Sequence, residues 1–374
     1  MTKVLHVITG WERGGAEQQL LLLVRHLPVQ CEIAVLTGTG ALTPAAEAAG
    51  IRVHHIGMRG NTDPRAVPRL ARLMRRGGYD VVHTHLYRAC VHGRVAARMA
   101  GIKRIVATEH SLGDGHLEGR PTTTAVRLLY RATERLGEAT IAVSPTVAGR
   151  LRDWGVADDR LLTLPNGIDA PEFSYDPRLR AGARAGLGIG ADEFVVGSVG
   201  RLVPTKRLDL LIRGLPRLDH VRLLLVGTGP EHARLGKLAA EVGVADRVIL
   251  TGDRADVPAL LSAMDLYAAP SAQETFGLSV VEALASGLPA LYCVCPAVDD
   301  LPHDAAPHAR RLPPLEAEWR AAIQDAALRP GPRLRPPPAV AHYAISRQIQ
   351  PLLRLYRHGI AAVGALPPSS APST

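Results

Sequence analysis

The sequence predicts an α/β fold with two doubly wound domains, in which parallel strands alternate with helices. Short runs rich in β-branched residues alternate with helix-like patterns along most of the 374 residues. A turn-rich stretch near residues 168–192, which contains the Gly/Ala-rich run RAGARAGLGIGAD, divides this alternation into two series. Hydrophobic residues make up 47% of the chain, which is sufficient for two sizeable cores.

The first series begins with the strand pattern KVLHVIT, a Gly-containing loop and a helix expected from Ala16 to Leu27. Ser144 and Pro145 supply an N-cap and a first-turn proline, so another helix is expected to begin there. Five further runs are expected to be strands: CEIAVLT, IRVHHI, YDVVHTH, KRIVATE and EATIAVS.

The second series contains five more expected strand runs: EFVVGSVGRL, VRLLLVGTGPEHARL, DRVILTGD, MDLYAAPS and LPALYCV. The proline-rich region 302–338 has weak periodicity and gives no clear elements. We therefore expect domains over 1–170 and 171–340, facing a central cleft at the carboxyl ends of their strands. A helix over 341–363, interrupted at Pro351, is expected to return to the first domain, and residues 364–374 are expected to be disordered.

The net charge of +9 would attract nucleic acids, anionic membranes or phosphorylated substrates. Aromatic residues are only 4% of the chain and do not cluster beside arginines, so we expect no nucleic-acid partner. The stretch PRAVPRLARLMRR places arginines near helical spacing. This spacing fits a solvated helix face, and it is also compatible with peripheral contact at a membrane.

The chain is expected to be cytoplasmic, with contact at the inner membrane face as a compatible addition. No run approaches the roughly 18 apolar residues of a membrane span, and the first ten residues lack the pattern of a secretion signal. The four cysteines form neither a CxxC pair nor a metal-finger spacing. They are interpreted as ordinary thiols.

Three glycine-bearing turns between strand and helix are candidate phosphate sites: TGWERGGAE, VGRLVPTK and VGTGPE. The third turn resembles a dinucleotide fingerprint, but His232 occupies the third glycine position. The second turn carries Arg201 and Lys206, a pair that could neutralise a diphosphate. Two surface charges near a helix start are the simpler alternative.

The stretch ETFGLSVVEALASGLPAL contains two glutamates with two competing interpretations. Ser279 followed by Glu282 has the spacing of a capping box, in which Glu282 would only help to begin a helix. A carboxylate is also a bidentate acceptor suited to a diol. Capping boxes are common, so this stretch taken alone favours the first interpretation, and the rest of the chain has to decide between the two.

Taken in order, these motifs resemble the retaining glycosyltransferases of family 4, which use nucleotide sugars and have the GT-B fold. The resemblance runs through Gly14-Gly15, TEHS with His110, SPTVAGRL, LPNGID, GRLVPTKRLDLLI, LLLVGTGP, VILTGD and ETFGLSVVEALASGLP. The run YCVCPAVDDL departs from the family's paired-glycine turn and leaves the donor preference open.

The resemblance implies a role for each matching residue. Arg201 and Lys206 would hold the donor diphosphate, Glu274 the transferred sugar and Glu282 the ribose. His110 would lie beside the sugar, with a buried core histidine as the alternative. The implied catalytic residues are His110, Glu274, Arg201 and Lys206. The implied donor-binding residues are Gly14, Gly15, Arg201, Lys206, Gly227, Glu274, Phe276, Gly277, Leu278 and Glu282.

The expected function is metal-independent transfer of a hexose or N-acetylhexosamine, with retention, from a UDP-linked or related nucleotide sugar. The acceptor would be a small molecule, a glycan or a lipid-linked sugar, and no cofactor or metal is expected. Asp299-Asp300 lacks the carboxylate-x-carboxylate pattern of metal-dependent sugar transferases. One alternative is a catalytically silent GT-B subunit, and another is a phosphorylase-like enzyme, although no lysine is a clear candidate for pyridoxal phosphate.

Overall fold

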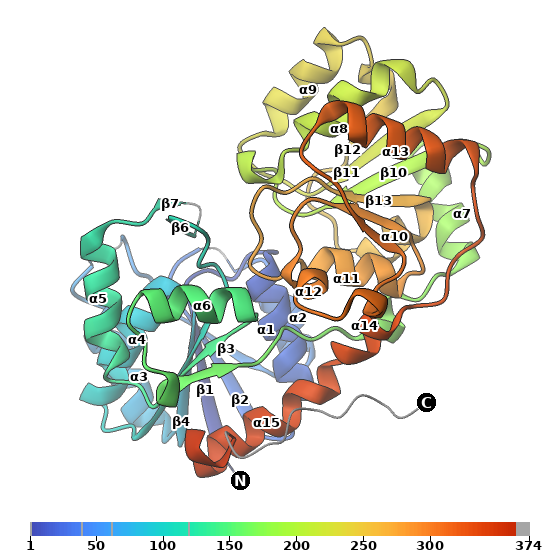
Figure 1. Cartoon of the computed structure of the whole chain (residues 1–374). Coiled ribbons are helices and arrows are strands. Elements are labelled where there is room, and N and C mark those ends of the chain that lie inside the picture. The colour runs from blue at the N-terminus through green and yellow to red at the C-terminus, as the bar shows by residue number, and fades with distance from the viewer. Residues whose placement is uncertain (1, 39, 61–62, 119, 364–374) are drawn as a thin grey trace. The chain divides into compact units, whose positions relative to one another are not determined.

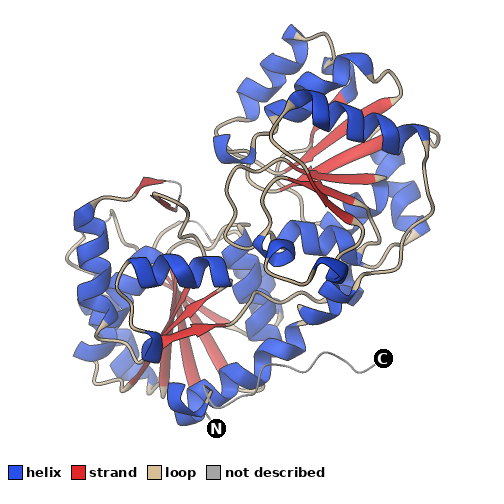
Figure 2. Cartoon of the chain, viewed as in Figure 1, coloured by secondary structure: helices blue, strands red, loops and turns tan. Residues whose placement is uncertain are grey.

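The computed structural model describes residues 2–38, 40–60, 63–118 and 120–363. The described residues divide into two compact units, one of residues up to 167 with 345–363 and the other of residues 168–344. Each unit contains a parallel sheet with helices on both faces (Figures 1 and 2). This arrangement confirms the predicted α/β class. The tail predicted to be disordered, residues 364–374, lies outside the described residues.

The first unit has a seven-stranded parallel sheet with strand order β3-β2-β1-β4-β5-β8-β9. Its strands are β1 (Lys3–Ile8), β2 (Gln30–Val35), β3 (Arg52–His55), β4 (Val81–His85), β5 (Arg104–Glu109), β8 (Ala139–Ala142) and β9 (Leu161–Thr163). A small antiparallel pair, β6 (His116–Leu117) and β7 (Arg120–Pro121), follows β5. The strand order reverses between β1 and β4, and open α/β sheets bind ligands at such a switch point.

The helices of the first unit cover both faces of the sheet. They are α1 (Gly15–His26), α2 (Thr43–Ala48), α3 (Ala66–Gly77), α4 (Tyr87–Met99), α5 (Thr124–Glu134), α6 (Pro145–Asp153) and α15 (Ile345–His358). Apolar residues of α3 and α4 pack in one core cluster, and those of α15 pack in another cluster on the sheet. The C-terminal helix α15 packs beside α1 although more than 300 residues separate them (Figure 1).

The helix α15 differs from its prediction because it continues through Pro351 instead of breaking there. Proline costs one backbone hydrogen bond inside a helix. Buried side chains on both sides of the proline, including Ile349, Leu352 and Leu355, pack in the core and outweigh that loss. The helix ends at His358, before Gly359, whose φ is 86°.

The second unit has a six-stranded parallel sheet with strand order β12-β11-β10-β13-β14-β15. Its strands are β10 (Phe194–Val199), β11 (Val221–Val226), β12 (Val248–Leu250), β13 (Leu266–Ala269), β14 (Ala290–Tyr292) and β15 (Ala309–Arg311). Here the order reverses between β10 and β13. The last strand, β15, lies in the proline-rich region for which no clear element was predicted.

The helices of the second unit are α7 (Pro177–Gly186), α8 (Asp209–Gly214), α9 (His232–Glu241), α10 (Val257–Ala263), α11 (Leu278–Ala285), α12 (Pro296–Asp299), α13 (Glu316–Leu328) and α14 (Pro338–His342). Apolar residues of α8, α9 and α13 form one core cluster with β10 and β11. Helices α10 and α11 contact β10, β13 and β14.

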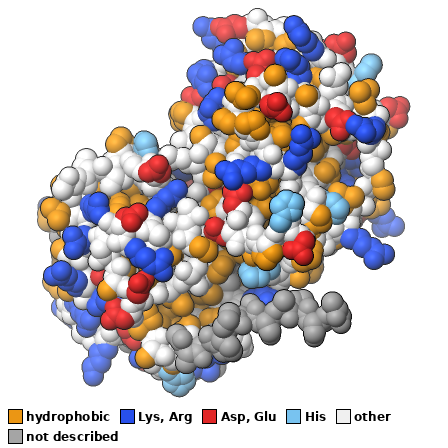
Figure 3. Space-filling model, viewed as in Figure 1, with side chains coloured by type: hydrophobic (Ala, Val, Ile, Leu, Met, Phe, Trp, Pro, Cys, Tyr) orange, Lys and Arg blue, Asp and Glu red, His pale blue; other side chains and the backbone are white. Residues whose placement is uncertain are grey.

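On the face shown in Figure 3, Lys and Arg side chains are scattered among acidic and apolar ones. They do not gather there into a single stripe of the kind that follows a nucleic-acid backbone. Among the described residues, no helix is both long and apolar enough to cross a membrane.

Candidate functional site

The switch point of the second unit brings together two of the sequence motifs. The loop after β10 contains Arg201 and a short 3₁₀ helix, Pro204–Lys206, and the loop after β13 contains Glu274. The Ala272 backbone N–H donates to the Thr205 carbonyl oxygen over 2.8 Å, which ties the two loops together. Residues that are about 70 positions apart in the sequence therefore form one surface at the place where parallel sheets bind ligands.

Lys206 and Glu274 form a salt bridge in this loop pair. The Lys206 Nζ lies 2.5 Å from Glu274 Oε1, and the two side chains are 24% and 15% exposed. Arg201 is exposed in the same loop, and no hydrogen bond or ion pair to its guanidinium is present among the described residues. Arg201 and Lys206 also line one small cavity. The two predicted cations therefore share one loop, and one of them, Lys206, is already paired with an acidic residue of the neighbouring loop.

The N-terminus of α11 follows directly after this loop. Gly277 is the N-cap with a φ of 97°, and Leu278 is the first helical residue. A Cβ atom on Gly277 would clash with Cys295 Sγ, so both the conformation and the packing require glycine. Phe276 is buried and packs edge-to-face on Tyr343, with ring centroids 4.9 Å apart. A helix N-terminus held in this way presents N–H dipoles to an anion.

The structure excludes the capping-box interpretation of Glu282. The observed N-cap, Gly277, lies two residues before the proposed cap Ser279, and it has no side-chain hydrogen bond. The Ser279 hydroxyl is instead hydrogen-bonded with Tyr267. The physical reason is that Gly277 adopts a left-handed conformation that L-residues with side chains rarely adopt, so the helix begins there.

Glu282 is a carboxylate with no hydrogen-bond or ion-pair partner in the described part of the chain, and it is partly buried. Burial, followed by the nearby charge of Glu172, raises the pKa of Glu282 to about 7. A partly buried carboxyl group without a structural partner is costly to the fold, which makes Glu282 a candidate ligand-binding residue.

Gly227, a predicted donor-binding residue, has a packing reason to be glycine. Its φ is 133°, and a Cβ atom would clash with the carbonyl oxygen of Gly200. The loop after β11 can therefore press against the loop after β10. Gly227 supports the loop that carries Arg201, and its own contact with a ligand remains a prediction.

The first unit places its own predicted residues at its own switch point. Gly14 is the N-cap of α1 and Gly15 is its first residue, so both follow β1. A Cβ atom on Gly15 would meet nothing within 4 Å, whereas one on Gly14 would clash with the flexible Glu17 side chain. The backbone at Gly15 is therefore open to the approach of a ligand.

His110 follows β5 and belongs to a row of buried histidines that we call the histidine row: His6, His83, His85 and His110. The His6 Nδ1 and His85 Nε2 atoms lie 3.1 Å apart, and so do His85 Nδ1 and His110 Nε2. Strand pairing explains the row, since β1 and β4 run in register with His6 opposite His83. His110 is thus both the predicted residue and a buried histidine, at 8% exposure.

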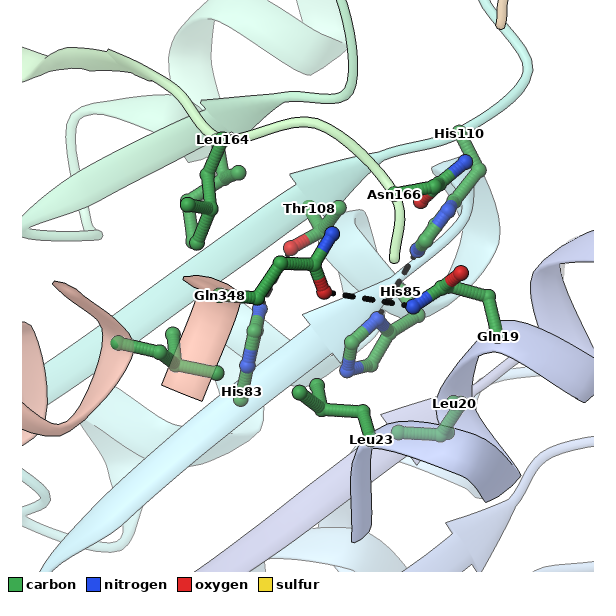
Figure 4. A pocket seen from close by; sticks show the side chains of 12 residues that line it. Gln19, Leu20, Leu23, His83, His85, Thr108, His110, Leu164, Asn166 and Gln348 are labelled. Atoms are coloured by element: carbon green, nitrogen blue, oxygen red, sulfur yellow. Dashed lines mark hydrogen bonds between the residues drawn. The ribbon is translucent and has the colours of Figure 1, made fainter. Parts of the chain in front are cut away.

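The histidine row has polar partners from elements that are distant in the sequence. His83 Nδ1 lies 2.6 Å from the Tyr356 hydroxyl of α15, and His83 Nε2 lies 2.7 Å from Thr108 Oγ1. A cavity of about 30 Å³ adjoins the row, with Gln19 of α1 and Gln348 of α15 on its wall (Figure 4). This volume is sufficient for one or two water molecules or one small polar group.

Burial keeps the histidine row neutral. It lowers the pKa of His6 to about 3 and that of His110 to about 4. The pKa values of His83 and His85 also lie well below the usual value, through burial and then through the neighbouring histidines. An imidazolium would lose its hydration here, so each ring carries a single proton at neutral pH.

Three of these rings, His6, His83 and His85, are close enough to hold a metal ion. Both nitrogens of His83 already have hydroxyl partners, and both nitrogens of His85 already have imidazole partners. A metal would have to replace these hydrogen bonds. The donor set fits the hydrogen-bonded row better than it fits a metal centre.

Two backbone outliers lie next to residues of these sites, one beside the histidine row and one beside a predicted cation. Leu86 follows His85 with a φ of 72° and a ψ of 156°, and Arg207 follows Lys206 with a φ of 51°. Such conformations are unfavourable for residues with side chains, and they concentrate at functional sites. At both switch points, therefore, the surrounding structure holds one residue in an unfavourable backbone conformation.

The predicted residues thus form two groups, one at the switch point of each unit. Sequence reasoning missed His6, His83, His85 and Tyr356. The signal was present in the alternation of KVLHVIT and YDVVHTH, because residues two apart in a strand face the same side.

Family models match most of the chain. Residues 13–171 match the model described as Glycosyltransferase Family 4, and residues 180–304 match the model described as Glycosyl transferases group 1.

Among curated proteins, the chain is similar to two GDP-mannose-dependent alpha-(1-6)-phosphatidylinositol monomannoside mannosyltransferases. That of Mycolicibacterium smegmatis is 34% identical over 52% of this chain and 53% of its own length. That of Mycobacterium tuberculosis is 33% identical over 68% of each chain. The match thus spans about half the length of the M. smegmatis protein.

Among solved structures, the chain is similar to Anabaena HepE in complex with UDP and glucose. The TM-score is 0.82 at 24% identity, and the match covers 95% of this chain and 99% of HepE. This likeness concerns the fold.

Proposed function

The chain belongs to the family 4 glycosyltransferases and has the GT-B fold, and on that premise we propose that it transfers a hexose or N-acetylhexosamine from a nucleoside diphosphate sugar to an acceptor hydroxyl, without a metal and with retention. The observation that carries this proposal is the switch point of the second unit. There two cations and Glu274 lie on loops that share a backbone hydrogen bond, and α11, which begins directly after the second loop, carries Glu282.

The cations and the helix N-terminus would bind the donor diphosphate. Arg201 offers a planar fork of donors and Lys206 a point charge, while the first turn of α11 offers backbone N–H groups. The Lys206–Glu274 salt bridge holds the ammonium group in place before the ligand arrives. Positive charge fixed in advance stabilises the diphosphate as it leaves, when its negative charge grows.

The two carboxylates would bind hydroxyl groups of the donor. Glu274 would accept hydrogen bonds from the transferred sugar, since it lies in the same loop pair as the diphosphate cations. Glu282 would accept hydrogen bonds from the ribose diol, because it has no protein partner among the described residues. Ionised carboxylates accept two such bonds at once.

In the reaction, the bond between the anomeric carbon and the diphosphate oxygen breaks, and the acceptor oxygen forms a new bond to that carbon. The acceptor proton passes to the leaving diphosphate. Retention follows when attack occurs on the face that the diphosphate leaves. His110 would hydrogen-bond an oxygen of a substrate. The fixed charges and dipoles supply the stabilisation of the transition state.

Two observations concern the base of the donor, and they favour different bases. Sequence analysis predicts a UDP-linked donor, whereas the similar proteins at 33–34% identity are named as GDP-mannose-dependent. Both donors present a ribose diol and a diphosphate, which are the groups that the proposed residues of the second unit would bind. We therefore propose a nucleoside diphosphate hexose and make its base an experimental question.

The acceptor is proposed to be a small molecule, a glycan or a lipid-linked sugar. The relatives act, by their names, on a phosphatidylinositol mannoside. A net charge of +9 is favourable for an anionic acceptor or for contact with an anionic lipid surface. Phosphatidylinositol-type lipids are therefore the first acceptors to test.

The test is a nucleotide-release assay with UDP-glucose, UDP-N-acetylglucosamine and GDP-mannose, in EDTA and in Mg²⁺, with and without acceptor. We expect one donor to release its nucleoside diphosphate at equal rates in both buffers. Dependence on Mg²⁺ would contradict the metal-free proposal. Tight binding of a donor without release, with any acceptor tried, would support the silent GT-B subunit instead.

A further inference from the structure

The segment that follows α13 contacts α11 at both ends of that helix. It begins in the proline-rich region for which no clear element was predicted. We call residues 330–343, which include α14, the strap (Figure 1). Five of the residues 330–338 are prolines. Because each proline ring fixes φ, this part of the strap loses little conformational freedom on folding and is a stiff connection.

At the C-terminus of α11, the strap is bonded through two consecutive residues. Arg333 Nη1 donates to the carbonyl oxygen of Ser286, the C-cap of α11, over 3.1 Å. The Leu334 N–H donates to the Gly287 carbonyl oxygen over 3.0 Å. A Cβ atom on Gly287 would clash with the Leu334 carbonyl oxygen, and the φ of Gly287 is 71°. The two backbones are therefore in direct contact, which requires glycine.

The guanidinium of Arg333 also binds the end of a second helix. Its Nη2 donates to the carbonyl oxygens of Leu261 and Ser262 in α10 over 3.1 and 2.7 Å. The guanidinium lies over the Tyr175 ring, 4.4 Å from its centroid. A cation at a helix C-terminus is favourable because the helix dipole is negative there. Burial lowers the pKa of Arg333 to about 10, so the group stays charged at neutral pH and joins the C-termini of α10 and α11.

At the N-terminus of α11, the strap ends at Tyr343. Its buried ring packs edge-to-face on Phe276, the residue directly before the Gly277 N-cap. The Tyr343 carbonyl oxygen accepts from the Ile168 N–H over 2.8 Å, which fixes the end of the strap. The strap therefore holds α11 beyond both of its ends, by Arg333 at one and by Tyr343 at the other.

The position of α11 depends on such contacts because the helix is short. It has eight residues, and helices shorter than about 12 residues are marginal by themselves. In the proposed function, the first turn of α11 and Glu282 in its middle bind two parts of one donor. A shift of about 1 Å in a binding group can cost about a hundredfold in rate. A device that fixes the helix at both ends would therefore serve donor binding.

We propose that the strap positions α11 for the donor, with Arg333 and Tyr343 as its positioning residues. This inference rests on the proposed function, since it assumes that the donor binds at α11. Both side chains act through the helix and not by contact with the donor. Their loss should change the affinity of the folded protein for a nucleoside diphosphate, and not only its stability.

Arg180 of α7 provides a matched control for Arg333. Its guanidinium donates to the carbonyl oxygens of Ser262 and Met264 over 3.1 and 3.0 Å, and Arg333 binds the same two oxygens. Its other bonds go to Ala263 and Asp265, and in the described part of the chain none reaches α11. Arg180→Met thus removes bonds to the end of α10 while leaving the bonds to α11 in place.

The direct test is hydrogen–deuterium exchange of the full-length protein without nucleotide. We expect α11 to exchange about tenfold faster in Arg333→Met than in wild type, since hydrogen bonds to a charged group are lost. Arg180→Met should leave α11 unchanged, and α9 is the internal reference for global unfolding. Equal exchange of α11 in Arg333→Met and wild type would overturn the proposal. This readout needs no nucleotide, so it stands apart from any failure of the proposed function.

The functional test is isothermal titration with UDP and GDP in EDTA, on Tyr343→Phe and Tyr343→Ala. Phenylalanine keeps the ring that packs on Phe276, whereas alanine removes it. We expect the alanine variant and Arg333→Met to lose about tenfold in affinity for the nucleoside diphosphate that wild type binds. Tyr343→Phe should keep the affinity of wild type, and so should Arg180→Met, even with a lower unfolding midpoint.

The two readouts separate the possible failures. Wild-type affinity in folded Arg333→Met and Tyr343→Ala, with faster exchange in α11, would show that the strap only stabilises the fold. An equal loss of affinity in Arg180→Met and Arg333→Met would also contradict the positioning role. If wild type itself binds neither nucleotide, the proposed donor site and the role of the strap in donor binding both fail, whatever the exchange shows.

Discussion

Replacing Glu282 by glutamine should weaken donor binding and stabilise the fold, two effects of opposite sign from one side chain. The carboxyl group has no partner among the described residues, and burial together with the charge of Glu172 raises its pKa to about 7. Glutamine keeps its size and removes the charge. A helix cap would behave differently, since its loss would only destabilise the protein.

The binding effect can be worked out from the pKa. Near a pKa of about 7, the ionised fraction of Glu282 rises from about a tenth at pH 6 to about nine tenths at pH 8. Nucleoside diphosphate affinity in the wild type should therefore rise about tenfold over this range, provided that the ribose binds the ionised form. Hydrogen bonds to a charged group contribute about 1.5–3 kcal/mol, so Glu282→Gln should lose about ten- to a hundredfold in affinity at pH 8.

The stability effect follows from the same raised pKa of Glu282. The folded state binds the proton more tightly than the unfolded state, so this contribution to stability is complete below pH 4.5. It is lost as the pH rises through about 7. The loss has an upper limit of about 3 kcal/mol. Glu282→Gln should therefore be more stable than wild type at pH 8 and nearly equal to it at pH 4.5.

The assays are isothermal titration with UDP and GDP at pH 6 and pH 8, and urea unfolding at pH 4.5 and pH 8. Glu172→Gln is the matched control, because it removes the exposed charge that helps to raise the pKa of Glu282. That variant should bind nucleotide more tightly than wild type at pH 6. Unchanged affinity of Glu282→Gln at pH 8 would refute the ribose assignment, and a lower stability at pH 8 would refute the electrostatic argument.

Three further predictions concern other parts of the two units. Lys206→Met should weaken nucleoside diphosphate binding by about ten- to a hundredfold, whereas Glu274→Gln should lower turnover more than nucleotide affinity. Titration measures the affinity and steady-state kinetics measure the turnover. Equal effects of a variant on affinity and on turnover would contradict these roles. Gly277→Ala should cost at least about 1–3 kcal/mol, because its left-handed backbone and its packing exclude a methyl group, while Gly15→Ala should keep the stability of wild type in urea unfolding. Tyr356→Phe should destabilise the first unit by about 1–3 kcal/mol, since it leaves a buried imidazole nitrogen without its partner; no change in the unfolding midpoint would show that this hydrogen bond has no net value.

Much of the fold was predictable because each element carries its own local signal. Ser144 and Pro145 predicted the start of α6, and the Ser144 hydroxyl indeed accepts from the Val147 N–H over 3.1 Å. The parallel strands are apolar runs, which sequence shows directly. The strand β15 was missed because its three residues lie in a proline-rich region and take their order from pairing with β14.

The candidate site was predictable only in part, because contacts between distant segments are set by strand order and register. Sequence placed Lys206 and Glu274 in separate motifs, and the reversal between β10 and β13 brings their loops together. The histidine row depends on the register of β1 against β4, which local patterns do not contain. The capping box at Ser279 was a false signal, since the left-handed Gly277 had already begun the helix.

The most direct measurement is isothermal titration of the purified protein in EDTA with UDP, GDP, ADP and NAD, on wild type and on Glu282→Ala. A family 4 glycosyltransferase with the proposed site should bind one nucleoside diphosphate in the absence of metal. It should ignore NAD, and its affinity should fall at least tenfold in the variant. Equal binding by both proteins, or no binding of any nucleoside diphosphate by a folded wild type, would contradict the proposed donor site.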